Sequence, residues 1–298
     1  MRVAAIVPVF ERPTVVVEAL ESVLAQRSPP AWLVVVDDGS TDATAAAVED
    51  WVARRRPSFP SEIVRLEHAG VSAARNRGVR AAGQVDVVAF LDSDDLWPPA
   101  YLESMTRALA EAPRAIAASC DKRSLDVPSG RIRTVDRRWA EGNATAEIVR
   151  RGPPGISNTV IRASALLAAG GFDEALETAE DLDLMLRLSL LGAWRWVPEV
   201  QIAYRHRLGD VRGEARSLGH HHADRRRTRA LVLERFLERE GERLLAVRST
   251  LREEVGRHWA KAGRQLAREG RKDEANECFR RAVAYRPLDV RSRWALLR

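Results

Sequence analysis

Residues 85–97, VDVVAFLDSDDLW, join an apolar run to an acidic cluster. The unbroken apolar residues at 87–91 predict a strand buried on both faces, as in a parallel sheet. The run ends in Asp-Ser-Asp-Asp at 92–95, where like charges repel one another and burial adds a desolvation cost. We therefore expect a positive group beside these carboxylates, and a divalent cation is the simplest one. The alternative is an acidic turn that caps the following helix.

The spacing of two of these carboxylates favours the cation. Asp92 and Asp94 stand two residues apart, so their side chains point to the same side of an extended chain. Their hard oxygen atoms suit Mg²⁺ or Mn²⁺, and a Mg²⁺ site with one or two carboxylates is usually completed by substrate phosphates.

Length and composition are those of a soluble globular protein. The 298 residues suffice for one large α/β domain and a smaller appendage. Nearly all of the basic residues are arginine, which indicates a composition bias more than a nucleic-acid-binding protein. Cys120 and Cys278 lie far apart, the first residues do not resemble a signal peptide, and no apolar run is long enough to span a membrane. These features predict a cytoplasmic protein.

Strands and helices alternate through the first 120 residues. The expected strands cover 2–7, 32–36, 63–66, 85–91 and 115–120, and Pro8 is expected to stop the first of them. The expected helices cover 14–26, 41–56, 70–82 and 98–111. This order predicts an α/β fold with a doubly wound, mainly parallel sheet flanked by helices.

The pattern is weaker from 121 to 206. We expect a hairpin return strand at 132–135, a strand at 157–161, short helices at 146–150 and 164–169, a helix at 180–191, and a strand pair or extended arm at 194–202. Trp194 is a core residue by this prediction, whereas Trp97 and Trp196 are either core residues or stacking platforms for a ligand.

Three of the predicted strands end in residues suited to a ligand. Ligands of doubly wound sheets bind outside the carboxyl ends of the strands. These ends carry Phe10 and Glu11, then Asp37 and Asp38, then the acidic cluster 92–95. Their convergence is a stronger indication of a binding site than any one of them alone.

The C-terminal third has a different character. We expect a domain at 1–206, a basic linker or helix at 207–230, and a helical region at 231–298. His220–His222 are more simply a solvated helix face than a metal site, because no Cys or carboxylate stands at ligand spacing. The small and large residues of the last region have the spacing of a single tetratricopeptide repeat, which would need the main domain or another chain to pack on.

Seven segments together resemble family 2 glycosyltransferases of the GT-A fold. They occur in the family's order and cover about residues 2–206: IVPVFERP (6–13), ALESVLAQ (19–26), VVVDDGSTDAT (34–44), GVSAARNRGVRAA (70–82), VVAFLDSDDLW (87–97), GGFDEAL (170–176) and EDLDLMLRL (180–188). The resemblance implies an inverting enzyme that uses a nucleotide-diphosphate sugar, UDP-sugars first among them.

The resemblance also implies a nucleotide site. Pro8 and Phe10 match the turn where an aromatic ring stacks near the nucleobase, and Asp38 would accept hydrogen bonds from the base or ribose. The family more often has Tyr then Asn at positions 10 and 11, so Phe10 and Glu11 depart from it and put one hydrogen bond in doubt. Arg75 would approach the base or the diphosphate, and its alternative is a surface arginine.

The acidic cluster matches the DxD motif of the family. Asp92, with Ser93 beside it, would reach the ribose or a metal-bound water, and Asp94 would hold a Mg or Mn ion that bridges the diphosphate. By the same resemblance, His206 is a candidate second ligand of the metal.

Asp181 matches the acidic residue that serves as the general base of the family. It would take the proton from the acceptor hydroxyl, a contribution of about 10²–10⁴-fold. Its alternative is a favourable charge at a helix start, and Asp183 is the next candidate base.

The resemblance leaves donor sugar and acceptor open. A glycan, lipid-linked or small hydroxyl acceptor fits it, as do peripheral membrane contact through the basic stretch and a homodimer through the C-terminal helices. An alternative function is a catalytically silent relative that acts as a binding or scaffold module through its helical C-terminus.

Overall fold

The structure is a computed structural model that describes residues 1–126, 129–135, 141–206 and 222–296, and it divides into two compact units. The sheet unit comprises Met1–Ala144, Pro154–Glu177 and Arg187–Ser217. The helical unit comprises Thr145–Pro153, Thr178–Leu186 and Leu218–Arg298. Each unit is built from separated stretches of the chain, whereas the sequence analysis expects three continuous ranges. Those expected boundaries stay a prediction.

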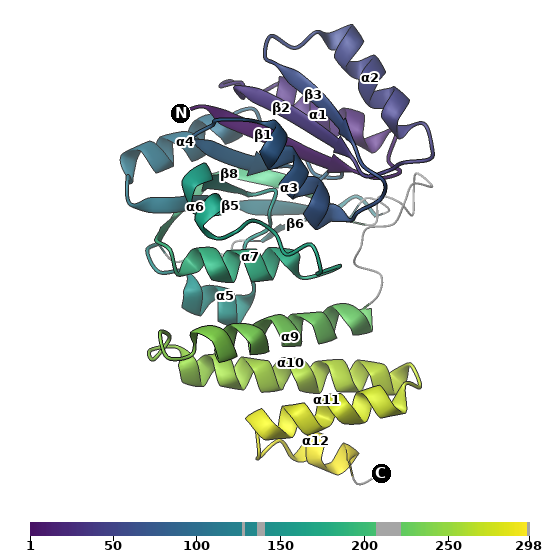
Figure 1. The fold of residues 1–298 in the computed structure, drawn as a ribbon, viewed down its shortest axis with the longest axis vertical. Helices are drawn as coiled ribbons and strands as arrows, with labels where there is room; N and C mark the ends of the chain where they lie inside the picture. The colour runs from purple at the N-terminus through teal and green to yellow at the C-terminus, as the bar shows by residue number, and fades with distance from the viewer. Residues whose placement is uncertain (127–128, 136–140, 207–221, 297–298) are drawn as a thin grey trace. The chain divides into compact units, whose positions relative to one another are not determined.

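One mixed sheet forms the centre of the sheet unit (Figure 1). Its strands are β1 (Val3–Val9), β2 (Trp32–Asp37), β3 (Ser61–Arg65), β4 (Val87–Phe90), β5 (Ala115–Asp126), β6 (Arg131–Val135), β7 (Thr159–Arg162) and β8 (Ala193–His206). The order is β3-β2-β1-β4-β7-β5-β6, with β8 paired to β5. Strands β1 to β4 are mutually parallel, as the alternation of strands and helices predicts.

Helices cover both faces of the parallel half. They are α1 (Val15–Leu24), α2 (Thr44–Arg55), α3 (Val71–Ala81) and α4 (Tyr101–Glu111), while α6 (Ala163–Ala168) contacts the antiparallel strand β7. Successive strand residues point to opposite faces. Val3, Ala5 and Val7 of β1 accordingly pack in one core with α1, α2 and α4, whereas Ala4 packs in a second core with α3. Burial on both faces explains the unbroken apolar strands.

Strand β1 continues through Pro8, so the expectation that this proline stops the strand is wrong. Pro8 pairs with Val36 of β2. Ile6 accepts a hydrogen bond from Leu91, on the β4 side, whereas Val9 accepts one from Asp38, on the β2 side. Alternate residues of a strand face the same neighbour, so the missing N–H of Pro8 faces β4, as the backbone of Ile6 does. The β1–β4 ladder has already ended there, at Ile6 and Phe90, so no sheet hydrogen bond is lost.

The second half of the sheet departs from the sequence expectations in three places. Strand β5 extends to Asp126 instead of ending near Cys120, because β6 and β8 pair with its far end. Strand β7 is antiparallel to both β4 and β5 and separates them. The stretch expected as a strand pair or arm is the single strand β8, whose register on β5 slips between Val197 and Gln201, beside Pro198.

Helices make up the second unit. They are α5 (Thr145–Arg151), the first part of α7 (Glu180–Ser189), α9 (His222–Glu240), α10 (Arg248–Arg268), α11 (Lys272–Tyr285) and α12 (Val290–Ala295). Helix α10 packs against α5, α9 and α11, and α9, α10 and α11 lie side by side in Figure 1. Within the described ranges, no helix has both the length and the apolar character needed to cross a membrane.

Candidate functional site

Three neighbouring strands of the sheet unit deliver the predicted ligand-binding residues to one edge. Strand β1 lies between β2 and β4, and all three run in parallel. Their carboxyl ends therefore lie side by side and continue into Phe10, Asp38 and Asp92, respectively. The sheet order thus brings together residues that are more than 80 positions apart in the chain.

Asp38 is held by the start of α3. Its carboxylate accepts hydrogen bonds from the backbone N–H groups of Ala69, at 2.7 Å, and Gly70, at 2.9 Å. The ring of Phe10 packs on that of His68 with centroids 4.2 Å apart, and His68 Nδ1 lies 3.1 Å from the Asp38 carbonyl oxygen. Asp38 therefore fixes the loop before α3, and its oxygens keep further lone pairs for a ligand.

Glu11 occupies an unusual backbone position beside this pair. Its φ of 48° lies in the left-handed region, which costs a residue other than glycine roughly 1–3 kcal/mol. Two contacts hold it there: its N–H donates to Ser40 Oγ at 2.9 Å, and its side chain accepts a hydrogen bond from Thr41 at 3.1 Å. The residue that departs from the family pattern thus ties the end of β1 to the turn after β2.

Arginine side chains pair with the two carboxylates of the DxD motif. Arg75 is buried in α3, and its Nη2 lies 2.7 Å from Asp92 Oδ1. Arg12 Nη1 lies 2.6 Å from Asp94 Oδ2, with side chains 14% and 17% exposed. The expected positive partners of this cluster are therefore present in the chain itself.

An aromatic pair and an asparagine support Arg75. The Arg75 guanidinium lies over the ring of Phe172, 5.1 Å from its centroid, and Phe172 meets Phe90 edge to face. Asn76 accepts a hydrogen bond from the Phe172 N–H and donates one to its carbonyl oxygen, both at 2.9 Å. Asn76 has a structural role here, and Arg75 is no surface arginine.

Asp95 is the buried member of the acidic cluster. Burial raises the pKa of its carboxyl well above the usual range, and the neighbouring charges of Asp94 and Asp92 raise it further. Burial and the two neighbouring charges thus both oppose the ionised form of the Asp95 carboxyl. Its Oδ1 has no hydrogen-bond partner within the described part of the chain.

Residues of strand β8 contact the loop that carries the DxD motif and hold it in place. Leu96 and Ala203 form an isolated antiparallel bridge, and Arg205 Nε donates to the carbonyl oxygen of Asp94 at 2.5 Å. Arg205 also pairs with Glu18 of α1. Sequence reasoning missed both Arg12 and Arg205, although each follows or ends a strand at the edge that carries the acidic residues.

The remaining predicted residues have simpler surroundings. Ser93 is buried, Pro8 lies inside β1, and Trp97 and Trp194 are core residues, with Trp97 Nε1 donating to Ser157. His206 is the last residue of β8, and its side chain lies outside the described residues, as do His220 and His221. Across the ranges that the structure describes, no three His, Cys, Asp or Glu side chains gather as a metal-binding group.

Asp181 belongs to the helical unit. It lies in the first turn of α7 with Glu180 and Asp183, and its Oδ1 accepts the Leu182 N–H at 2.7 Å. Ala179, with a φ of 61°, precedes this turn and sets the direction in which the helix begins. Asp181 therefore stands at a helix start, as the alternative interpretation expects, and among the residues that the structure describes its second carboxylate oxygen, Oδ2, accepts no hydrogen bond.

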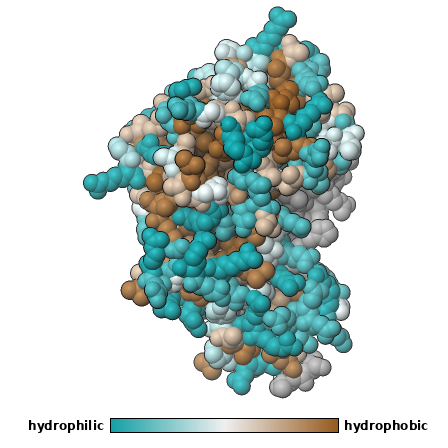
Figure 2. Space-filling view, in the orientation of Figure 1, coloured by the Kyte–Doolittle hydropathy of each residue, from teal (hydrophilic) through white to brown (hydrophobic). Residues whose placement is uncertain are grey.

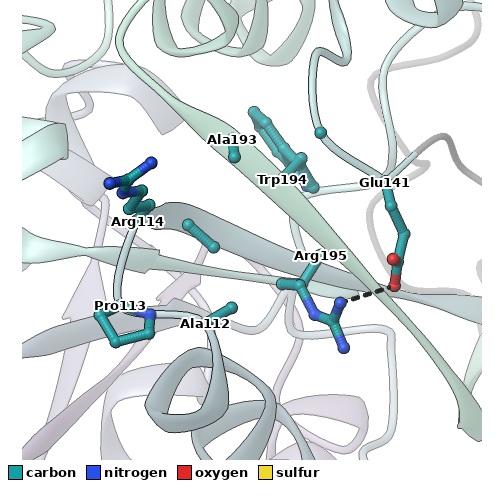
Figure 3. Close-up of a pocket in the computed structure, with 9 residues that line it drawn as sticks. Ala112, Pro113, Arg114, Glu141, Ala193, Trp194 and Arg195 are labelled. Atoms are coloured by element: carbon teal, nitrogen blue, oxygen red, sulfur yellow. Dashed lines mark ion pairs between the residues drawn. The ribbon is translucent and has the colours of Figure 1, made fainter.

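A pocket of about 450 Å³ lies at the amino ends of β5 and β8. Figure 3 shows that its walls include the ion pair between Arg195 and Glu141, whose atoms are 3.0 Å apart. Ala115 and Ala193 in its lining are the first residues of their strands. The pocket contains none of the predicted ligand-binding residues, so the strand ends described above are the better candidate site.

Comparisons with known proteins agree on the sheet unit. The family model described as "Glycosyl transferase family 2" matches residues 4–160. A "Pre-mycofactocin glycosyltransferase" of Mycobacterium tuberculosis is 31% identical over 187 residues, which cover 59% of this chain and 37% of that protein. "Glycosyltransferase GlyA" of Streptococcus pneumoniae is 31% identical over 116 residues, 39% of this chain and 16% of that protein. The chain thus matches well under half the length of these relatives.

Solved structures resemble the whole chain at low sequence identity. TarS residues 1–349 of S. aureus, in complex with UDP-GlcNAc, has a TM-score of 0.70 at 18% identity, over 100% of this chain and 88% of that one. The mannosyltransferase PcManGT of Pyrobaculum calidifontis, with GDP-Man and Mn²⁺, has a TM-score of 0.60 at 21% identity, over 99% and 78% of the two chains. Both likenesses show the fold, which is that of GT-A glycosyltransferases.

Proposed function

The chain belongs to glycosyl transferase family 2, and on this premise we propose that it transfers a sugar from a UDP-sugar to a hydroxyl acceptor with inversion at the anomeric carbon. The observation that carries the proposal is the edge where the ends of β2, β1 and β4 bring Asp38, Phe10 and the DxD motif side by side. Similar proteins solved with UDP-GlcNAc and with GDP-Man support a nucleotide-sugar donor.

The nucleoside would lie against Phe10 and Asp38. The ring of Phe10 offers a flat apolar face to a base, and the free lone pairs of Asp38 accept from a base N–H or a ribose hydroxyl. Glu11, fixed by Ser40 and Thr41, follows Phe10 in the chain, and Pro8 precedes it in β1. Because Asp38 is already held by two backbone N–H groups, its carboxylate is oriented before the ligand arrives.

The diphosphate would lie between Arg75 and the DxD motif. Asp92, with Ser93, would contact the ribose, and Arg75 would hold Asp92 in place while facing the phosphates. Asp94 fits a divalent cation, since its hard oxygen atoms already bind a positive group, Arg12. We propose His206 as a further ligand. A bound Mg²⁺ or Mn²⁺ would neutralise the charge that builds on the leaving nucleotide.

Asp181 is our candidate for the general base. In an inverting transfer the base removes the proton of the acceptor hydroxyl while that oxygen attacks the anomeric carbon. Asp181 stands in the first turn of α7, and the hydrogen bond from Leu182 N–H orients its carboxylate. The acceptor would be a glycan, a lipid-linked sugar or a small hydroxyl compound.

The helical unit supports a smaller proposal about architecture. Helices α10 and α11 pack closely enough that a Cβ on Gly263 would lie 2.8 Å from the Phe279 ring. Small-against-large packing between two antiparallel helices is typical of a tetratricopeptide repeat, and we propose one such unit here. A homodimer through these helices, peripheral membrane contact and a cytoplasmic location stay predictions.

Thermal melting with UDP or GDP and Mn²⁺ tests the donor site. We expect UDP with Mn²⁺ to raise the melting temperature, and Asp94→Asn to abolish the Mn²⁺-linked part of that rise. Asp50→Asn, which removes an exposed carboxylate of α2, is the matched control and leaves the rise unchanged. A chain that shows no shift with any nucleotide would instead be a silent binding or scaffold module. Hydrolysis of a panel of nucleotide sugars then identifies the donor.

A further inference from the structure

Positive charge is concentrated in the C-terminal helices. Residues 222–298 contain 21 Arg or Lys and 12 Asp or Glu, a net charge of +9, whereas the whole chain carries +6. The preceding residues are therefore slightly acidic as a group. Such asymmetry along a chain indicates a surface that attracts anions. On the face drawn in Figure 2, hydrophilic side chains cover most of these helices.

Many of these cations have a carboxylate partner. Arg271 pairs with Glu274 at 2.7 Å, Arg281 with Glu234 at 2.9 Å, and Arg257 with Glu254 at 2.5 Å. The first of these pairs is partly exposed, whereas Glu234 and Glu254 are buried, and all three arginines have their charge matched by a carboxylate. They therefore account for a solvated helix surface and need no ligand.

A second group of cations lacks such partners. Lys261, Arg264 and Arg268 of α10 follow one another at intervals of three and four residues and so share one face of the helix. Arg226 of α9 lies close enough to influence both Lys261 and Arg264. We call these four residues the basic stripe. Within the described chain none of the four has a carboxylate within 4.0 Å, although Glu254 acts on Lys261 and Asp289 on Arg264 from a greater distance.

The basic stripe is crowded as well as unpaired. Partial burial lowers the pKa of Lys261 and of Arg264. Glu254 opposes this for Lys261 and Asp289 for Arg264, whereas neighbouring cations lower both, among them Arg226. Lys261 and Arg264 are partly buried and Arg226 and Arg268 are exposed, so these like charges repel one another within reach of a ligand from solvent, and a bound anion relieves that repulsion. The folded protein therefore maintains an arrangement that an anionic ligand would stabilise.

We propose that the basic stripe binds a linear, phosphate-bearing polyanion. From Lys261 to Arg268 the stripe extends about 10 Å along the helix axis, longer than a single phosphate group. Guanidinium groups, which dominate the stripe, match phosphate oxygens in pairs and are always charged. The stripe shares no residue with the proposed donor site, and this proposal does not depend on the proposed transferase activity.

A polyanion fits better than an anionic membrane. A helix that lies in a membrane surface needs an apolar face beside its basic one. In α10 the apolar residues, among them Val255, Trp259 and Leu266, are buried within the helical unit, where α10 packs against its neighbours. The basic stripe therefore has no apolar partner on its own helix to insert into lipid.

Fluorescence anisotropy of the full chain with labelled linear polyphosphate tests this proposal. We expect Lys261→Gln/Arg264→Gln to weaken binding by about tenfold or more and to reduce the slope of log affinity against log salt by about 2. The control, Arg239→Gln/Arg243→Gln, also removes two positive charges, from exposed side chains paired with Glu240, and should change the affinity less than twofold. Arg226→Gln, on an exposed position of α9, repeats the test without touching α10.

Several results would overturn the proposal. These are equal losses in both double variants, no binding by the natural chain, binding of orthophosphate as tight as that of the polymer, or binding to vesicles of anionic phospholipid without binding to polyphosphate. Circular dichroism melting shows whether each variant is folded. The melting shift with UDP and Mn²⁺ should survive in the stripe variants, so that failure of the donor site and failure of the stripe are told apart.

Discussion

The pairing of Arg12 with Asp94 predicts that the protein resists binding a metal ion until a nucleotide is present. Asp94 cannot hold a divalent cation and Arg12 in the same way, because both need the same carboxylate. Arg12→Gln removes the competing charge but keeps a polar side chain of similar length. We therefore expect this variant to bind Mn²⁺ more tightly than the natural chain when no nucleotide is added.

The structure sets the size of this effect. A hydrogen bond between charged groups contributes about 1.5–3 kcal/mol. At 2.6 Å the Arg12–Asp94 contact is short, but side chains 14% and 17% exposed retain some screening by water, so the lower half of that range applies. Since 1.4 kcal/mol corresponds to a factor of ten, Mn²⁺ should bind on the order of tenfold more tightly to Arg12→Gln.

Electron paramagnetic resonance of free Mn²⁺ during titration measures this affinity directly. Arg54→Gln, which breaks an exposed pair with Asp50 on α2, is the control and should leave it unchanged. Unchanged or weaker Mn²⁺ binding by Arg12→Gln, in a variant with an intact melting transition, would refute the reasoning. If Asp94→Asn also leaves Mn²⁺ affinity unchanged, the metal assignment fails instead.

Further variants test the base, the core and a buried histidine. Asp181→Asn should keep nucleotide affinity and lose about 10²–10⁴-fold in turnover, and retained turnover would move the base to Asp183. Gly78→Ala should lower stability by about 1–3 kcal/mol in a denaturant titration, because its Cβ would lie 2.5 Å from Ile6 Cγ2; an unchanged midpoint would contradict this packing. Burial and then nearby cations lower the pKa of His258 to about 3, so the folded protein holds this side chain neutral. Stability is therefore full above pH 6.5 and falls at lower pH, where the unfolded chain takes up a proton that the folded chain does not. From pH 7 to pH 5 the natural chain should lose about 2 kcal/mol that His258→Gln retains, and parallel pH profiles would argue against the shift.

Much of the sheet unit is predictable because its periodic patterns are strong. Apolar runs such as 87–90 are buried on both faces, and helices such as α4 bury residues at intervals of three and four. The doubly wound, mainly parallel fold follows from the alternation of these elements and is confirmed by the sheet order and by the structural likeness. Adjacency of β2, β1 and β4 then places the motif residues at one edge.

Other features depend on contacts that a local pattern does not contain. Pro8 remains in a strand because the ladder on one side has ended, which only the register reveals. The pairing of Arg12 with Asp94 spans 82 positions of the chain and depends on which strands are neighbours. The sequence indicates that a positive group belongs beside the acidic cluster, but a metal ion and an arginine satisfy that requirement equally well, so the pattern alone could not distinguish them.

The helical unit combines stretches that are far apart in the chain, and this affects the order in which it can fold during synthesis. Helix α5 buries Ile148 and Val149, and among its neighbours is α10, which begins at Arg248. A ribosome that adds about 5–20 residues per second needs roughly 5–20 s to make the intervening residues. During that time the apolar side of α5 lacks one of its packing partners, so the helical unit completes its core only after α10 has been made.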